Sequence, residues 1–491
     1  MRMKRTGKIS DRKELKEFSH VQKKTQGLSL IIFFVYTLKC SAGIQLPEVF
    51  GSNMVIQSGR SFCIWGQADP CKTVHINVSW QGKSAAVAVE KSGQWKTVFA
   101  PPGTSGPHRI EISADKSLII FENIWCGEVW LACGQSNMEM PVGNIIPKVY
   151  EGVLDYQQEI AEANYPLIKF FTPKYKKTYM PPTEYDGKWV NCSPETVKTF
   201  SAVGYFFARR LQRDLKVPTG IINCSWGATK IELWIPEKQI LGCPEFSSAL
   251  NEPRKYPHLY KTLIEPLAPF SIRGAIYYQG ESNVGNAFQY DKLMSKLING
   301  WRSEWGQGDF PFYYVQIAPC ANFYKSGSST LLRDAQRMAM SIPNTGMVVT
   351  TDIAEPCAPS PHNIHPMNKQ EVGRRLALWA LNRTYRKNVA CSGPIYKKMK
   401  TEDDKIRVYF DSTDGGLKAI SESLAGFTIA GQDKNFVEAQ AAIEGNTVIV
   451  FGSKVSRPIA VRFGWTDTPM PNIFNEAGLP ASPFRTDDWP Q

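Results

Sequence analysis

The sequence has no apolar run long enough to cross a bilayer as a helix. The run Leu28–Leu38 has eleven residues, whereas a membrane-spanning helix needs about 20. A basic stretch ending in Lys24 precedes it and small residues follow it, as in a secretory signal peptide cleaved after Ala42 or Gly43. We therefore predict that residues 1–42 are a signal peptide, with an uncleaved anchor or a wrongly chosen start codon as the alternatives.

Histidine is scarce and no Cys-x-x-Cys pair is present, which argues against a structural zinc site. Only five His follow residue 42, and zinc sites require clustered Cys and His ligands. Of the eleven Cys, Cys40 lies in the predicted leader and ten remain. An even number permits disulfides in an exported chain, although the spacing does not determine their pairing.

A concentrated basic face is also missing, although the formal net charge is +12. Ten Lys and Arg and three acids in residues 1–42 account for +7, so that +5 is spread over the rest of the chain. A nucleic-acid-binding protein would gather its positive charge on one face or along one helix. We therefore expect no nucleic-acid partner.

Four Asn-x-Ser/Thr sequons support export. We expect glycosylation at Asn77 and Asn382. Asn191 is a poorer candidate because Pro194 follows its sequon, and Asn223 is poorer because it lies in an apolar, strand-like run. With the leader, these sites indicate a protein of the secretory pathway.

Hydrophobic residues make up 43% of the chain and charged residues 21%, which is typical of globular proteins. Residues 44–120 contain short alternating runs with turn residues every 8–12 positions, the pattern of a β-sandwich. Strand patterns return after Pro394. We predict four segments: the leader 1–42, an N-terminal β-sandwich at 43–123, a catalytic domain at 124–392 and a second small β domain at 393–491.

The middle segment alternates apolar runs with amphipathic stretches of helical length. Such alternation predicts an α/β fold with a mostly parallel sheet covered by helices on both faces. Ligands bind such sheets at the carboxyl ends of the strands. Residues 145–199 show no clear period and read as an insertion. The candidate strands are Glu128–Cys133, Gly220–Ser225, Gly274–Tyr278, Phe312–Ile317 and Gly346–Thr351, and the candidate helices are Phe200–Leu215, Tyr290–Trp305, Leu331–Ile342 and Asn368–Arg383.

The first of these strands ends in the sequence Gly134-Gln135-Ser136-Asn137. A strand followed by a glycine-containing turn and a serine is how α/β hydrolases present a nucleophile, although this is not their G-x-S-x-G motif. Alternatively, Ser136 caps a helix and Asn137 forms a turn.

Polar and glycine residues also follow the next two strands. Gly227 would let a backbone N–H face a substrate oxyanion, or it belongs to an ordinary βα turn. After the third strand, Gln279 and Asn283 provide amide donors for a developing negative charge, and Glu281 lies between them. We predict that this third motif is functional because three polar residues beside a glycine are rarely only solvated surface.

A serine nucleophile requires a base, and His365 lies in a loop before the last predicted helix. His362 is the competing histidine. Asp352 at the fifth strand end, or Glu355, could orient the imidazole. Four strand-end motifs thus converge on one sheet edge, and each supplies a part that acyl transfer needs.

The motifs at residues 134–137, 279–283 and 365–377 resemble the sialate O-acetylesterases of the SGNH hydrolase superfamily over about residues 44–491. The resemblance implies a three-layer α/β/α domain flanked by β-sandwich-like domains, and a secreted or lysosomal enzyme that removes O-acetyl esters, notably from the 9-position of sialic acids. Ser136 is then the nucleophile and His365 the base. Gly227 matches the second oxyanion element, and Gln279 with Asn283 matches the third.

The implied reaction needs no metal or cofactor, and the implied partner is an acetylated sialic acid or sialoglycan, with no membrane contact after leader cleavage. One departure concerns the third triad residue. Many SGNH enzymes carry Asp three residues before the catalytic His, where this chain has His362. Asp352 becomes the candidate, or a backbone carbonyl orients His365 and the site is a dyad.

Substrate choice depends on the rim of the predicted site. A sialate carboxylate requires a cation, and Arg333 and Lys230 are the candidates, with Gln135 and Glu281 completing the substrate-binding set. The residues Trp226, Trp234 and Tyr278 suit sugar stacking. The alternatives are an acetylesterase acting on neutral, xylan-like polymers, a non-catalytic glycan-binding protein, and an acyl-protein or lipid esterase.

Overall fold

The computed structural model describes residues 43–145, 150–175, 187–241, 243, 246, 258–320, 323–324, 327–354, 364–470 and 472–489. The predicted leader, residues 1–42, lies outside them, as do Glu355 and His362. Within these ranges, none of the helices combines the length and the hydrophobicity that crossing a bilayer requires.

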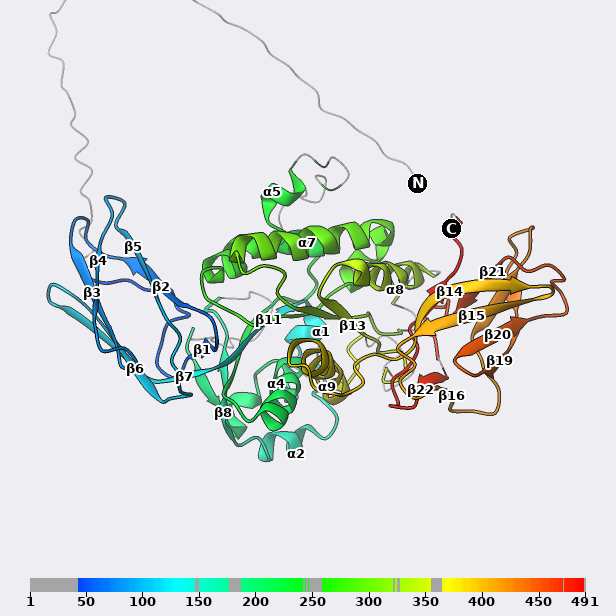
Figure 1. Ribbon diagram of the computed structural model, residues 1–491, viewed down its shortest axis with the longest axis horizontal. Coiled ribbons are helices and arrows are strands. Elements are labelled where there is room, and N and C mark those ends of the chain that lie inside the picture. The colour runs from blue at the N-terminus through cyan, green and yellow to red at the C-terminus, as the bar shows by residue number, and fades with distance from the viewer. Residues whose placement is uncertain are drawn as a thin grey trace, which may run out of the picture. The chain divides into compact units, whose positions relative to one another are not determined.

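A large, mostly parallel sheet forms the centre of the fold (Figure 1). Its strands lie in the order β13-β12-β11-β7-β10-β8-β9, and all neighbours in this order pair in parallel except β8 with β9. The predicted mixed α/β fold is confirmed. The strands are β7 (Ser117–Gly134), β8 (Tyr165–Phe171), β9 (Val190–Cys192), β10 (Thr219–Ser225), β11 (Gly274–Tyr278), β12 (Phe312–Val315) and β13 (Thr345–Val348).

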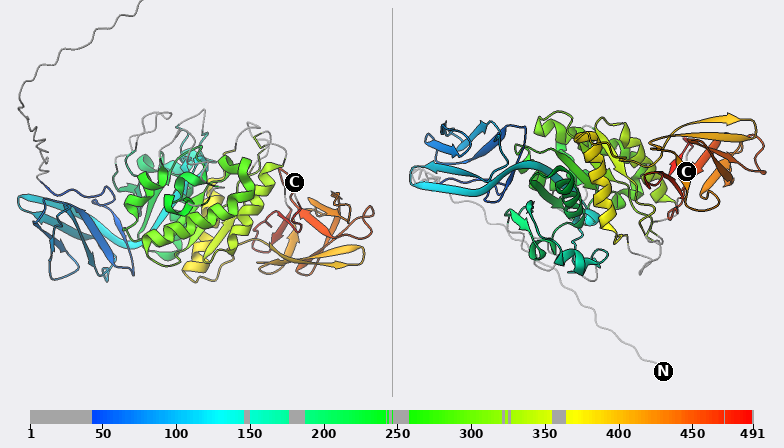
Figure 2. Two further views of the ribbon diagram at one scale, coloured as in Figure 1. Left: turned by 90° about the horizontal axis from the view of Figure 1, so that it is seen from above. Right: turned by 60° about the horizontal axis from the view of Figure 1, so that its bottom comes forward.

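Helices cover both faces of this sheet (Figures 1 and 2). α7 (Tyr290–Trp305) and α8 (Ser328–Met338) lie on one face, and α4 (Ala202–Leu215) packs beside α9 (Lys369–Trp379) on the other. Strands buried on both sides explain the continuous apolar runs in the sequence. The shorter helical segments are α1 (Ser136–Glu139), α2 (Tyr156–Ala161), α3 (Pro194–Val197), α5 (Glu237–Ile240), η1 (Ile231–Trp234), η2 (Tyr260–Ile264), η3 (Glu265–Leu267), η4 (Glu281–Gln289), η5 (Ala339–Ser341) and η6 (Ala380–Thr384).

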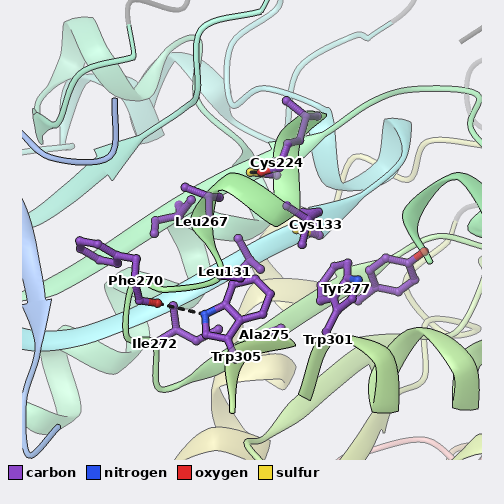
Figure 3. Close-up of a cluster of buried hydrophobic side chains, with 14 of the residues drawn as sticks. Leu131, Cys133, Cys224, Leu267, Phe270, Ile272, Ala275, Tyr277, Trp301 and Trp305 are labelled. Carbon is purple, nitrogen blue, oxygen red and sulfur yellow. Dashed lines mark hydrogen bonds between the residues drawn. The ribbon is translucent and has the colours of Figure 1, made fainter. Parts of the chain in front are cut away.

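The two faces of the sheet belong to separate apolar clusters. Under α7, the rings of Trp301 and Trp305 pack with Tyr277 of β11, and the Trp305 indole N–H donates to the Phe270 carbonyl at 3.0 Å (Figure 3). Under α4 and α9, Trp130 of β7 stacks on Tyr313 of β12. The central strands are therefore held from both sides, which fixes the positions of their carboxyl ends.

β7 connects the N-terminal strands to the large sheet. Its first half pairs with N-terminal strands, and its second half is a central strand of the large sheet. It pairs antiparallel with β6 and parallel with β1. The domain boundary predicted between residues 123 and 124 thus lies inside one continuous strand. The N-terminal strands are β1 (Val55–Gln57), β2 (Phe62–Gln67), β3 (Thr73–Val78), β4 (Ala85–Ala88), β5 (Gln94–Phe99) and β6 (His108–Ala114).

The C-terminal residues form two four-stranded antiparallel sheets and a two-stranded one, with an apolar cluster of their own. The four-stranded sheets have the orders β14-β15-β20-β19 and β18-β17-β21-β23, and β16 pairs with β22. The strands are β14 (Ile395–Glu402), β15 (Lys405–Asp411), β16 (Leu417–Ala419), β17 (Phe427–Ala430), β18 (Val437–Glu438), β19 (Gln440–Glu444), β20 (Thr447–Phe451), β21 (Ala460–Phe463), β22 (Ile473–Asn475) and β23 (Phe484–Arg485).

The interpretation of residues 145–199 as an insertion outside the sheet is wrong in part. β8 lies within this segment and pairs in parallel with β10. Its apolar run is interrupted by Lys169, which is buried and donates to the Asn191 side-chain oxygen at 2.6 Å. A charged residue in the middle of a buried strand conceals the strand from a reading based on hydrophobicity.

The disulfides that the even number of Cys permits are not formed among the nine Cys of the described residues. Cys40 and Cys357 lie outside the described ranges. Seven of the nine are buried, where Cys acts as a small apolar side chain. Even Cys133 and Cys224, which are register partners in β7 and β10, do not form a disulfide.

Candidate active site

A serine and a histidine from distant parts of the chain meet at the carboxyl end of β7. The hydroxyl of Ser136, the first residue of α1, lies 2.8 Å from Nε2 of His365. Ser136 retains 8% of its surface exposed, and His365 is half-buried in the segment before α9. This is the geometry by which a histidine accepts a proton from a serine nucleophile.

The backbone at the end of β7 explains why Ser136 projects from the sheet edge. Gly134 has a φ of +144°, and a Cβ at this position would lie 2.1 Å from the carbonyl oxygen of Tyr278. Gln135 donates its N–H to that carbonyl at 3.0 Å, and Trp226 donates to the Gly134 carbonyl at 2.9 Å. Glycine is required because β7 must bend between β10 and β11 at close contact.

The two neighbouring strands bring the other predicted motifs to the same place. Ser225 of β10 and Tyr278 of β11 are both register partners of Gly134. The turn after β10 places Gly227 so close that a Cβ there would lie 3.5 Å from Cβ of Ser136. The structure therefore brings together the first three strand-end motifs and His365.

The Gly227 N–H donates to the Glu139 carboxylate at 2.7 Å. The Tyr150 hydroxyl donates to the same carboxylate oxygen at 3.4 Å, and the Tyr150 ring meets the His365 ring edge-on at 5.1 Å between centroids. Neither Glu139 nor Tyr150 is among the site residues predicted from the sequence. Glu139 lies three positions after the nucleophile in the same motif, whereas Tyr150 carries no local signal.

The predicted amide donors belong to a buried network behind the turn. Nε2 of Gln279 donates to the side-chain oxygens of Gln135 and Asn283 at 3.1 and 2.8 Å, and to the Thr229 carbonyl at 3.0 Å. Nδ2 of Asn283 donates to Glu232 at 2.8 Å. The Gln279 amide and one N–H of the Asn283 amide therefore bind protein acceptors and hold the three strand-end turns together.

A second buried network lies under the catalytic pair. Nδ2 of Asn137 donates to Glu281 at 2.6 Å and to the Ile364 carbonyl at 2.9 Å, while Lys369 donates to the Asn137 side-chain oxygen at 2.6 Å. Burial raises the pKa of Glu281 and lowers that of Lys369 to about 7, and the Glu281 charge opposes the fall for Lys369. Lys369 and Asn137 both lie in the sequence motifs of the family resemblance, but no role was predicted for Lys369, and a turn-forming role for Asn137 was only the alternative.

A protein-family model described as carbohydrate esterase, sialic acid-specific acetylesterase, matches residues 126–382, more than half of the chain. The chain belongs to this family. It is therefore an ester hydrolase, and the predicted family resemblance is confirmed.

Individual relatives agree with this assignment. The sialate O-acetylesterases of Homo sapiens and Mus musculus are 25% and 26% identical, over 93% of this chain and 95% and 97% of theirs. A solved carbohydrate acetylesterase from Xanthomonas citri is 33% identical, covers 91% of this chain and 100% of its own, and superposes with a TM-score of 0.81. The similarity to this structure extends beyond the family domain into the flanking strands.

In this esterase, Asp352 binds an arginine. Its two carboxylate oxygens accept hydrogen bonds from the Arg375 guanidinium at 2.7 and 2.6 Å, and Arg375 also bonds Glu371 and the Val349 carbonyl. This bidentate pair ties the end of β13 to α9. The geometry supports a structural role for Asp352 better than the predicted role of orienting His365, and the alternatives Glu355 and His362 lie outside the described residues.

We expect Asp352→Asn to lower kcat less than about 10-fold, whereas loss of a triad acid costs about 10⁴-fold. Because a partly buried ion pair is broken, the free energy of unfolding should fall by about 3 kcal/mol. Esterase kinetics and urea unfolding measure the two effects. Asp309→Asn is the matched control, since its side chain is 68% exposed. A 10⁴-fold loss of kcat at unchanged stability would make Asp352 the third triad member.

The prediction that Arg333 lies on the rim is wrong. Its side chain on α8 is fully buried, and Nη2 donates to the Thr466 carbonyl. Burial lowers its pKa to about 10. Sequence proximity to the site could not show that this face of α8 packs against the strands of the C-terminal segment. Lys230, in the turn after β10, is partly exposed.

The predicted aromatic rim is largely interior. Trp234 and Tyr278 are fully buried, and Trp226 is 8% exposed and stacks on Tyr175 at 5.4 Å. Of the predicted glycosylation sites, Asn77 is exposed on β3, whereas Nδ2 of Asn382 donates to the Val389 carbonyl at 2.8 Å. Asn77 is thus the more accessible acceptor of the two.

Proposed function

We propose that this esterase hydrolyses O-acetyl esters of sialic acids through an acetyl-enzyme intermediate, with Ser136 as nucleophile and His365 as base. The observation that carries the proposal is the 2.8 Å contact between Ser136 Oγ and His365 Nε2 at a sheet edge. The family and its sialate O-acetylesterase members support the substrate class. The proposal places the enzyme in the secretory route, in keeping with the leader-like N-terminal segment.

The reaction begins when His365 Nε2 accepts the Ser136 proton as Oγ attacks the acetyl carbonyl carbon. The C–O bond to the sugar then breaks, and the imidazolium returns the proton to the departing sugar hydroxyl. Water attacks the acetyl-serine with His365 again accepting a proton, and the collapse releases acetate and restores the Ser136 hydroxyl. Every proton transfer passes through the same imidazole.

The oxyanion requires hydrogen-bond donors at the turn. The Ser136 N–H is available, because the described residues offer it no acceptor. The Gly227 N–H lies beside it but is bound to Glu139 in the resting enzyme. In our mechanism Glu139 releases Gly227 when the oxyanion forms, and Gln279 and Asn283 act by fixing the turns.

A neutral acetylated polysaccharide is the second candidate substrate. The solved carbohydrate acetylesterase shares 33% identity with this chain, more than the 25–26% of the sialate enzymes. Arg333, one of the two cations predicted to bind a sialate carboxylate, is buried against Thr466. The burial of Arg333 favours a site that does not depend on an anionic sugar.

Acetate release distinguishes the two candidates. We expect the chain purified from residue 43 to deacetylate 9-O-acetylated sialic acid at least about 10-fold faster, in kcat/KM, than acetylated xylan, which corresponds to about 1.4 kcal/mol of transition-state binding. Protein with Ser136→Ala provides the blank for both substrates. Activity on xylan alone would retain the catalytic pair and transfer the assignment to neutral polymers. Inactivity of the folded enzyme on both would overturn the proposal.

A further inference from the structure

Three buried polar side chains from three different elements meet under the catalytic pair. Asn137 comes from α1, Glu281 is the first residue of η4 and Lys369 is the first residue of α9. Asn137 and Lys369 are fully buried, and Glu281 is 4% exposed. Asn137 lies between the other two, because Lys369 donates to its oxygen while its nitrogen donates to Glu281, both at 2.6 Å.

These contacts fix the orientation of the Asn137 amide. An ammonium can only donate and a carboxylate can only accept, so a flipped amide would lose both bonds. In the observed orientation, Nδ2 also reaches the Ile364 carbonyl at 2.9 Å. Asn137 directly follows Ser136, and Ile364 directly precedes His365. One side chain therefore connects the backbone beside the nucleophile to the backbone beside the base.

Stability alone does not account for this arrangement. A buried ammonium is costly, and Lys369 carries it at the N-terminus of α9, where the helix dipole disfavours a cation. Oε2 of Glu281 is buried without a hydrogen-bond partner within the described ranges. Replacing such a buried ionic group with apolar residues is often neutral or stabilising. We therefore attribute to the buried ionic group an effect on the geometry of Ser136 and His365 rather than on stability.

We propose that Lys369 is a positioning residue that acts through Asn137, with Glu281 as its counter-charge, to hold Ser136 and His365 at reacting distance. This inference rests on the proposed serine mechanism. It adds that Lys369 affects kcat although it contacts neither the substrate nor the reacting atoms. It concerns hydrolysis of any acetyl ester and so does not depend on which sugar is the substrate.

The charge of Lys369 gives the proposal a pH signature. The groups that face its ammonium are Glu281 of η4, the Tyr278 ring of β11 at 5.4 Å, and the Asn137 amide; His365 lies beyond Ser136. Its pKa of about 7 means that the ammonium, and with it the charged donor to Asn137, is lost as the pH rises through 7. We therefore expect kcat to decline above about pH 7.

The test compares Lys369→Met and Glu281→Gln with the parent enzyme on p-nitrophenyl acetate, with Lys387→Met, an exposed lysine, as control. Lys369→Met should lower kcat on the order of 10-fold with KM little changed, because misplaced catalytic groups slow the chemical step, and should remove the decline above pH 7. Glu281→Gln keeps an acceptor for Asn137 but removes the anion, so it should move the decline to lower pH. Lys387→Met should leave kcat and the pH profile unchanged.

The outcomes separate this inference from the proposed function. If Ser136→Ala retains esterase activity, the serine mechanism itself fails. If Ser136→Ala is inactive while folded Lys369→Met keeps the parent kcat and pH profile, only the positioning role is overturned. If Lys369→Met does not fold, as judged by circular dichroism, Glu281→Gln decides: a decline displaced to lower pH supports the proposal, and an unmoved decline overturns it.

Discussion

We expect Ser136→Ala to lower kcat by on the order of 10⁴- to 10⁶-fold, the loss seen when a serine hydrolase loses its nucleophile. Without Oγ no acetyl-enzyme forms, and His365 has no hydroxyl to deprotonate. Ser136 is 8% exposed and its hydroxyl bonds only His365 among the described residues. The fold should therefore be retained, which thermal unfolding can confirm.

The same experiment can show that Ser136 and His365 act as a unit. His365→Ala should cost nearly as much as Ser136→Ala, and the double variant should be no slower than the slower single one, because either loss removes the same step. Ser341→Ala, at an exposed serine on η5, is the matched control. Losses that multiply in the double variant would mean that the two residues do not share a step.

The second large effect is expected at Gly134. Alanine there would place Cβ 2.1 Å from the Tyr278 carbonyl oxygen, at a φ of +144°. Backbone strain and overpacking together should lower the free energy of unfolding by about 3 kcal/mol. Because Ser136 lies two residues further on, a shift of the turn should also lower kcat by about 10²-fold.

Urea unfolding and steady-state kinetics on one preparation measure both effects of Gly134→Ala. Gly285→Ala is the control, since a Cβ at Gly285 meets no atom within 4 Å. It should change stability by less than about 0.5 kcal/mol. Parent-like kinetics and stability in Gly134→Ala would show that the turn tolerates a side chain and that the close contact with Tyr278 does not fix the nucleophile.

The parts of the site that could be predicted from sequence are those encoded locally. Gly134 and Ser136 follow directly on a buried strand, and parallel topology alone brings Gly227 and Gln279 beside them. The Asn137–Lys369 bond joins residues 232 positions apart, and neither has a neighbour in sequence that indicates the other. Such contacts depend on how α9 packs, which a hydrophobic pattern does not specify.

The wrong predictions also arise from packing that the local sequence does not specify. The sequence makes Arg333 and Trp234 candidates for the rim of the site but does not show which way their side chains point. In the structure both are fully buried. Similarly, Lys169 interrupts the apolar pattern of β8 and hides the strand. The lysine is tolerated there because its ammonium donates to the Asn191 side chain and lies 5.6 Å from the centre of the Trp125 ring. Whether such a residue is buried or exposed depends on its neighbours in space, which the local sequence does not show.

The continuity of β7 has a consequence for how this enzyme can be divided. The family match begins at residue 126, in the middle of a strand that runs from Ser117 to Gly134. A fragment trimmed to that match would begin inside the strand that carries the nucleophile turn. It would also lack β1, which pairs with β7 at Trp125, Cys126 and Gly127, and would expose a strand edge of the kind that promotes aggregation. We therefore expect the smallest piece that folds and acts to be larger than the piece by which the family is recognised.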